Sequence, residues 1–209
     1  FLRGAGTSLR GHGSPRMQTD TDMNNAANYP LLASPHIQLH GPVDGGMYSS
    51  FKQQLRDAPT GGPLVVSVTT LGGDPEMARA MADDIRLLRQ YTGRECLFLG
   101  KVAVYSAGAT FMAAFPVDKR FLTRHSRIMI HERQMQSTIQ LNGPLNTLGY
   151  TLRAKLHEIQ DSIKIQDEGF ADIVRGSRVS LDELKQKAPS NWYIEAIEAR
   201  DLGLVLDVI

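Results

Sequence analysis

The stretch Gly100-Lys-Val-Ala-Val-Tyr-Ser-Ala-Gly-Ala-Thr-Phe-Met-Ala-Ala-Phe115 decides the fold, and Ser106 lies at its centre. The apolar run over residues 96–104 is typical of a strand buried on both faces, as in parallel sheets. The small and apolar residues after Ser106 favour a buried helix. A serine at such a junction lies beside the unpaired N–H groups of a helix N-terminus, which favour negative charge. The stretch therefore fits a nucleophile, although an ordinary N-cap serine has the same pattern.

Composition predicts one globular domain. The chain has 209 residues, of which 42% are hydrophobic and 22% charged, with a formal net charge of +1. This charge provides no field for nucleic acid or an anionic membrane surface, and no apolar run approaches the ~20 residues of a membrane span. The single cysteine, Cys96, requires no oxidising compartment, so we expect a cytoplasmic location. With no His-Glu-x-x-His motif, we expect no metal and no cofactor.

The first 23 residues are rich in Gly, Ser and Arg and contain few large apolar groups, so we expect a disordered or non-native tail ahead of a single domain over residues 24–209. They lack the apolar core of a signal peptide. The chain begins with Phe1, which indicates a fragment or an engineered start; Met17 and Met23 are the candidate native first residues.

Strand and helix patterns alternate along the domain. The expected strands cover residues 36–40, 64–69, 95–104, 119–122, 127–130 and 204–209, and the expected helices cover residues 47–58, 75–91, 106–115, 145–175 and 180–187, with one more from residue 196. Such alternation favours βαβ crossovers and a mostly parallel sheet. The helix over residues 145–175 is much longer than the average of about 11–12 residues, and its apolar side suggests packing against a neighbouring subunit.

Four segments, taken in order, resemble the proteolytic subunit of the Clp protease, a family within the ClpP/crotonase superfold. Residues 64–73 are similar to its strand ending in a Ser-Pro-Gly-Gly turn, and Tyr105-Ser-Ala-Gly108 to its Ala-Ser-Met-Gly nucleophile motif. Residues 126–131 are similar to Ser-Arg-Val-Met-Ile-His, and residues 199–205 to a segment near its C-terminus. The chain is identified as a divergent ClpP-like member, with an α/β fold of repeated β-β-α and βαβ units and a long handle-type helix.

The resemblance implies a serine-type peptidase that hydrolyses unfolded or short polypeptides through an acyl-enzyme. Ser106 would be the nucleophile and His131 its general base, because a free hydroxyl is a poor nucleophile. The backbone N–H groups of Gly72 and Ala107 would form the oxyanion hole. The family resemblance also implies a homo-oligomeric ring of six or seven subunits, able to stack on another ring. An ATPase partner is possible but unsupported, because residues 24–35 do not match the segment that the family uses for it.

The third member of the triad departs from the family pattern. An ungapped alignment through residues 180–187 puts Lys187 where the family has an aspartate. A carboxylate there would stabilise the imidazolium, whereas a lysine cation would oppose it. Another acid could substitute, with Glu183, Asp182 and Glu132 as candidates. Lys187 could instead act as a base in a Ser–Lys arrangement, or be a solvated lysine at a helix end.

Two further functions stay open from the sequence. A catalytically degenerate ClpP-like scaffold subunit would explain Lys187. A crotonase-type enzyme that binds acyl-CoA would use the two oxyanion donors without needing Ser106 and His131. The family's proline after the histidine and the one before the Gly-Gly turn are replaced here, by Glu132 and Leu71, and residues 136–148 look longer than their counterpart in the family.

Overall fold

The computed structural model describes residues 29–209, in which seven strands form one mixed sheet. The tail expected over residues 1–23, with Met17 and Met23, and residues 24–28 lie outside the described part. The strands are β1 (Ile37–His40), β2 (Leu64–Thr70), β3 (Cys96–Tyr105), β4 (Arg120–Leu122), β5 (Arg127–Ile130), β6 (Trp192–Glu195) and β7 (Asp207–Val208). The helices are η1 (Pro30–Ala33), α2 (Gly45–Asp57), α3 (Pro75–Thr92), α4 (Ala107–Met112), η2 (Val117–Lys119), α5 (Leu145–Val174), α6 (Leu181–Lys187), η3 (Ala188–Ser190) and α7 (Ala196–Asp201).

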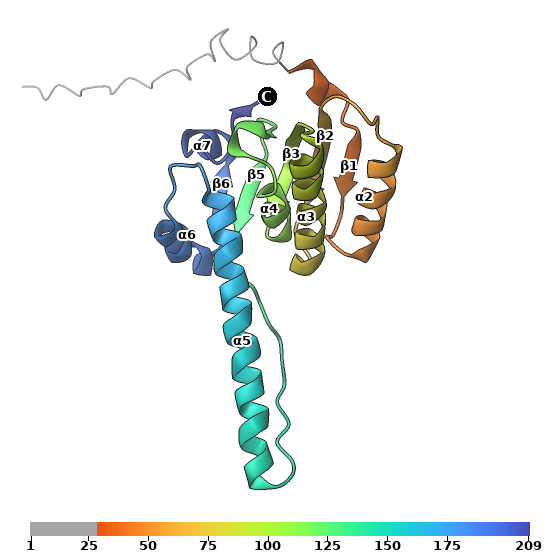
Figure 1. Cartoon of the computed structure of the whole chain (residues 1–209). Coiled ribbons are helices and arrows are strands. Elements are labelled where there is room, and N and C mark those ends of the chain that lie inside the picture. Colours follow the sequence, from red (N-terminus) through yellow and green to blue (C-terminus); the bar gives the residue numbers. More distant parts are fainter. Residues whose placement is uncertain (1–28) are drawn as a thin grey trace, which may run out of the picture.

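The expected α/β architecture with a mostly parallel sheet is confirmed. The sheet order is β1-β2-β3-β4-β7, with β5 added to β3 and β6 added to β5. Every pairing among the described strands is parallel except β5 with β6, which is antiparallel. Helices α2, α3 and α4 lie against one face of the sheet (Figure 1) and enclose the main apolar core with it. Ala107 and Ala109, the residues that follow Ser106, belong to this core.

Strand β3 changes neighbours halfway along its length, which shapes the site. Its residues 98–100 pair with β4, and its residues 103–105 pair with β5. Between them lies Val102, an exposed β-branched residue with φ of 61° and a genuine backbone outlier. The register with β2 also shifts there, as at a β-bulge. The kink brings the end of β3, and so Ser106, beside the end of β5.

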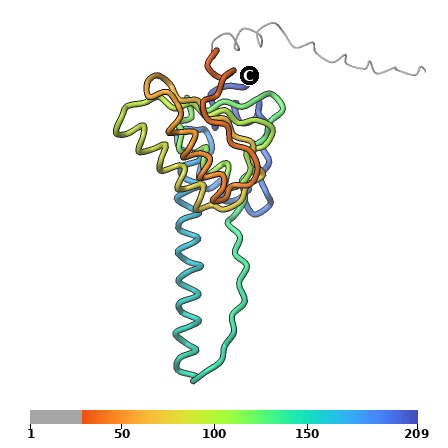
Figure 2. The backbone as a smooth tube through the Cα atoms, turned by 90° about the vertical axis from the view of Figure 1, so that its right-hand side faces the viewer, coloured from red at the N-terminus to blue at the C-terminus, as the bar shows by residue number. Residues whose placement is uncertain are grey.

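The long helix and the segment before it form a hairpin that projects from the body. Helix α5 is 30 residues long, which confirms the expected handle-type helix. Residues 131–142 have no regular secondary structure and run out to the tip of the hairpin, from which α5 returns to the body beside them (Figures 1 and 2). Gly176, at φ of 82°, follows the end of the helix in the left-handed conformation typical of a C′ glycine. The outer part of the hairpin exposes Leu145, Leu152 and Leu156.

Two strands differ from the sequence-based expectations. Strand β6 was not expected, and it extends the sheet beyond β5. The final strand covers only Asp207–Val208 instead of residues 204–209, because residues 202–206 form a turn that buries Leu204 and Val205 in the core. Within residues 29–209, no helix combines the length and the hydropathy that crossing a bilayer would require.

Buried Arg120 joins the elements at one end of the core. Its guanidinium donates to the main-chain carbonyls of Phe115, Ile173, Leu204 and Ala113, at 2.7–3.4 Å. These acceptors belong to the end of the α4 region, the end of α5 and the C-terminal turn. Burial lowers the pKa of Arg120 to about 10, so the guanidinium stays protonated at neutral pH.

We expect Arg120→Met to lower the free energy of unfolding by about 3 kcal/mol, because buried carbonyls lose their donors. Urea unfolding at fixed protein concentration measures this loss. Arg120→Lys keeps the charge but reaches fewer carbonyls, so it should lie between the parent and the methionine variant. An unchanged midpoint for Arg120→Met would contradict the role of Arg120 in joining these elements.

Candidate active site

Ser106 lies at a strained turn between strand and helix. It follows the last residue of β3 and precedes α4, with φ of 53° and ψ of −113°. A non-glycine residue with positive φ is uncommon and is held only when its surroundings over-determine it. The Ser106 hydroxyl makes no capping hydrogen bond to the helix. The structure therefore disfavours the ordinary N-cap interpretation and leaves the hydroxyl available for chemistry.

One hydrogen bond joins Ser106 to the strand that carries His131. The main-chain N–H of Ser106 donates to the carbonyl of Met129 at 2.8 Å, continuing the parallel pairing of β3 with β5. His131 comes two residues later, directly after β5. The two expected catalytic residues, 25 positions apart in sequence, thus emerge at the same end of neighbouring parallel strands.

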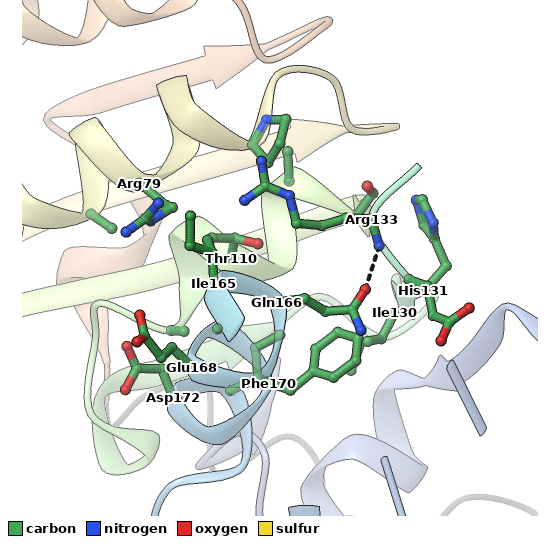
Figure 3. Close-up of a pocket in the computed structure, with 18 of the residues that line it drawn as sticks. Arg79, Thr110, Ile130, His131, Arg133, Ile165, Gln166, Glu168, Phe170 and Asp172 are labelled. Atoms are coloured by element: carbon green, nitrogen blue, oxygen red, sulfur yellow. Dashed lines mark hydrogen bonds between the residues drawn. The ribbon is translucent and has the colours of Figure 1, made fainter. Parts of the chain in front are cut away.

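A cavity of about 420 Å³ contains both residues. Ser106, Ala107 and Thr110 line it from the α4 side, and His131 lines it from the end of β5. Helix α3 forms one wall and the last turns of α5 form another (Figure 3). The floor along α4 is made of small residues, which leaves room for a substrate next to Ser106.

The Gly-Gly turn after β2 packs directly on Ser106. Gly72 has φ of 111°, and a Cβ built on it would lie 2.9 Å from the Ser106 Cβ. Its N–H donates to the Thr70 hydroxyl at 3.0 Å, so the donor expected from Gly72 is already occupied. Among the described residues, the N–H of Gly73 has no hydrogen-bond partner, and Gly73 lines the cavity. Gly73 is therefore a better oxyanion candidate than Gly72. The sequence pointed to Gly72 because it does not reveal that the Thr70 hydroxyl accepts the Gly72 N–H.

Ala107 keeps its expected place. It is the first residue of α4, where main-chain N–H groups have no partner within the helix. Ala107 also lines the cavity. The N–H groups of Ala107 and Gly73 thus come from two elements that meet at Ser106.

Neither expected candidate for the third residue is hydrogen-bonded to His131. The Nδ1 atom of His131 is buried and has no hydrogen-bond partner in the described chain. The Lys187 ammonium is 2.7 Å from a carboxylate oxygen of Glu183 and 4.3 Å from the centre of the Trp192 ring. The Lys187 ammonium is therefore engaged by Glu183 and Trp192 and makes no hydrogen bond to Ser106 or His131 in the described chain. Glu183 is engaged by Lys187, and neither Asp182 nor Glu132 supplies the missing contact.

The sheet register points to Asn191, which the sequence analysis missed. In the antiparallel pair of β5 with β6, Ile130 lies opposite Trp192. One step further along this register places Asn191 across from His131. Asn191 has φ of 57° and is exposed, with its N–H bonded to the carbonyl of Ala188 at 3.1 Å. Only recognition of β6 as the partner of β5 would have revealed it.

The single cysteine, Cys96, lies at the start of β3, at the opposite end of the strand from Ser106. Burial raises the pKa of the Cys96 thiol to about 11, so Cys96 is protonated at neutral pH and is a poor nucleophile. No group of three or more His, Cys, Asp or Glu side chains in residues 29–209 could hold a metal ion. Charged side chains also line the cavity, among them Arg79, Asp83, Glu132 and Asp172.

A serine at a strained strand-to-helix turn, next to a histidine and two main-chain donors, is the arrangement that serine hydrolases use. Comparison with known proteins narrows this class. The Clp protease family model matches residues 19–209, and the chain belongs to the Clp protease family. Of the two branches of the superfold considered from the sequence, this is the protease branch.

The relatives found are distant but cover most of the chain. The ATP-dependent Clp protease proteolytic subunit 2 of Treponema pallidum is 26% identical, over 86% of this chain and 84% of its own length. Proteolytic subunit 3 of Parasynechococcus marenigrum is 25% identical, over 82% of this chain and 80% of its own. A point mutant of ClpP1 from Listeria monocytogenes has a similar fold, with a TM-score of 0.66 and 18% identity, over 88% of this chain and 95% of that one.

Substitution of Gly72 tests whether the Gly-Gly turn packs directly against Ser106. Gly72→Ala would place a methyl group 2.9 Å from the Ser106 Cβ and 3.3 Å from its Oγ. We expect the rate of Ser106 modification by a fluorophosphonate to fall at least about tenfold, since Ser106 would have to move. Gly62→Ala is the matched control, because Gly62 also has positive φ but a Cβ there would meet no atom within 4 Å. Equal rates in the two variants would contradict the proposed packing.

Proposed function

We propose that the protein is a serine-type peptidase that cleaves unfolded or short polypeptides through an acyl-enzyme at Ser106. The observation that carries the proposal is the shared cavity of Ser106 and His131, together with the Ser106–Met129 hydrogen bond that fixes their strands. Membership of the Clp protease family supports the same reaction.

In the proposed mechanism, the Ser106 hydroxyl attacks the carbonyl carbon of the scissile peptide bond. Because Nδ1 of His131 is buried, Nε2 is the nitrogen that would accept the Ser106 proton and later deliver it to the leaving amine. The N–H groups of Ala107 and Gly73 would donate to the oxyanion, and each such donor is typically worth about 3–4 kcal/mol of the barrier. Water activated by His131 would then release the acyl group.

Asn191 would orient the histidine in place of the family's aspartate. An asparagine carbonyl can accept a hydrogen bond from Nδ1–H, which would hold the imidazole in the tautomer that the reaction needs. An amide carries no charge, so it would stabilise the imidazolium less than a carboxylate. We therefore expect a working site with reduced activity, and the exposed Asn191 side chain would have to rotate onto His131.

The hairpin of α5 supports assembly into a ring. Its outer part exposes Leu145, Leu152 and Leu156 on the helix, with Ile139 and Leu141 on the extended segment. Such an apolar strip on a projecting hairpin would be covered by another copy of the chain. We propose a homo-oligomeric ring of six or seven subunits, with the hairpin contacting a stacked ring. The relatives' names contain "ATP-dependent", so an ATPase partner is a further possibility to test.

Labelling with a fluorophosphonate, read by intact mass, tests the nucleophile. We expect one adduct per chain in the parent protein and none in Ser106→Ala or His131→Ala, because the hydroxyl reacts only when a base removes its proton. Every serine other than Ser106 should remain unmodified on peptide mapping. An assembled oligomer that takes no label would instead favour the catalytically degenerate scaffold subunit.

Substitution of Asn191 tests the third position. We expect Asn191→Asp to raise peptidase activity about tenfold or more, because a carboxylate would stabilise the imidazolium that forms during the reaction. Lys187→Met is the matched control and should leave the rate within about twofold, since Lys187 pairs with Glu183 and not with His131. A larger effect from Lys187→Met than from Asn191→Asp would instead favour Lys187 as the third member of the triad. Initial rates on an unstructured fluorogenic peptide measure both.

A further inference from the structure

A second, smaller hollow lies beside the cavity of Ser106. It has a volume of about 160 Å³ and lies between the segment after His131 and helix α5. Its apolar lining comes from Met135, Ile159 and Ile163. The two hollows share three lining residues, which are Arg133, Gln134 and Gln166. The two hollows are therefore adjacent, and these three residues separate them; we call these residues the partition.

The partition contains a hydrogen bond between the main chain and a side chain. The N–H of Arg133 donates to Oε1 of Gln166 at 2.7 Å, and Figure 3 shows Gln166 reaching from α5 to the main chain of Arg133. A glutamine side chain ends in an amide, the same chemical group as a peptide bond. Gln166 thus takes the position on Arg133 that the carbonyl of a bound peptide would take.

The segment around Arg133 is suited to bind a peptide backbone. Residues 131–143 make no hydrogen bond between main-chain groups within the described chain, so their main-chain groups, apart from the Arg133 N–H held by Gln166, are available. Extended peptides bind such segments by adding a strand, and side-chain pockets beside them supply selectivity. The segment begins at His131, so a peptide bound along it would pass the nucleophile.

The segment remains anchored when Gln166 is removed. The Arg133 guanidinium is 2.6 Å from a carboxylate oxygen of Glu76, at the start of α3. The hydrogen bond from Arg133 holds the pKa of Glu76 below its usual value, so this ion pair persists at neutral pH. A peptide that binds the Arg133 N–H would therefore need to displace only the half-buried side chain of Gln166.

We propose that Gln166 occupies a substrate subsite, and that a bound peptide displaces it to place an apolar side chain in the hollow of Met135, Ile159 and Ile163. Displacement joins the two hollows into one groove that starts at Ser106. The inference rests on the proposed function, because the occupant is the polypeptide substrate. It predicts selection for longer peptides with an apolar residue away from the scissile bond.

Peptide binding in the Ser106→Ala background tests the inference without requiring turnover. Three fluorescein-labelled peptides are compared by anisotropy: a short one, a longer one extended by a leucine-containing segment, and the same longer one with serine for leucine. Adding Gln166→Ala should tighten binding of the leucine peptide by about three- to tenfold, the factor that one neutral hydrogen bond represents. Binding of the short peptide should not change.

Two control variants sharpen the result. Gln160→Ala removes an exposed glutamine on α5 that lines neither hollow, and it should leave all three affinities unchanged. Gln166→Glu keeps an acceptor oxygen for the Arg133 N–H, so it should not tighten binding. Weaker or unchanged binding of the leucine peptide in Gln166→Ala would overturn the inference, as would equal gains for the leucine and serine peptides. Failure of the proposed reaction is detected separately, as absence of fluorophosphonate labelling in the parent protein.

Discussion

The hydrogen bond from the Ser106 N–H to the Met129 carbonyl is the contact on which the site depends. It closes the last rung between β3 and β5 and holds Ser106 at φ of 53°. Because His131 follows β5 directly, the same rung sets the distance between the two strand ends. A backbone conformation that is unfavourable for an isolated serine persists here because the sheet on one side and the Gly72 turn on the other leave it no alternative.

The kink in β3 makes this contact possible. Strands β4 and β5 follow one another along the same edge of β3, with β4 beside residues 98–100 and β5 beside residues 103–105. The positive φ of Val102 and the register shift against β2 turn the second half of β3 towards β5. The two residues with positive φ, Val102 and Ser106, lie on either side of the part of β3 that pairs with β5. Backbone strain concentrates at functional sites in this way.

The sequence was sufficient for the parts of the fold that local patterns determine. Apolar runs, turn residues and caps predicted β2, β3, α3 and the long α5 to within a few residues, and the order of motifs identified the family. It was insufficient wherever the answer depended on pairing between distant segments. Asn191 becomes a candidate only through the antiparallel register of β5 with β6, and β6 is a four-residue strand whose pattern is too short to be distinctive.

The same limit explains the oxyanion donors. The Gly-Gly turn was correctly placed beside the nucleophile, but the choice between Gly72 and Gly73 depends on the Thr70 hydroxyl, which binds the Gly72 N–H. Gln166 is a similar case, because its contact with Arg133 crosses 33 positions of the sequence. Side chains that satisfy a specific main-chain group are fixed by tertiary geometry, and residue type alone does not reveal them.

The proposed function requires that peptide bonds are cleaved through an acyl group on Ser106. The most direct measurement mixes the protein with an activated peptide ester, quenches with acid within the first turnover, and locates the added mass by peptide mapping. We expect an acyl group on the peptide that contains Ser106, which disappears as the hydrolysed product forms. Hydrolysis with no acyl group on Ser106, or an acyl group on another residue, would contradict it.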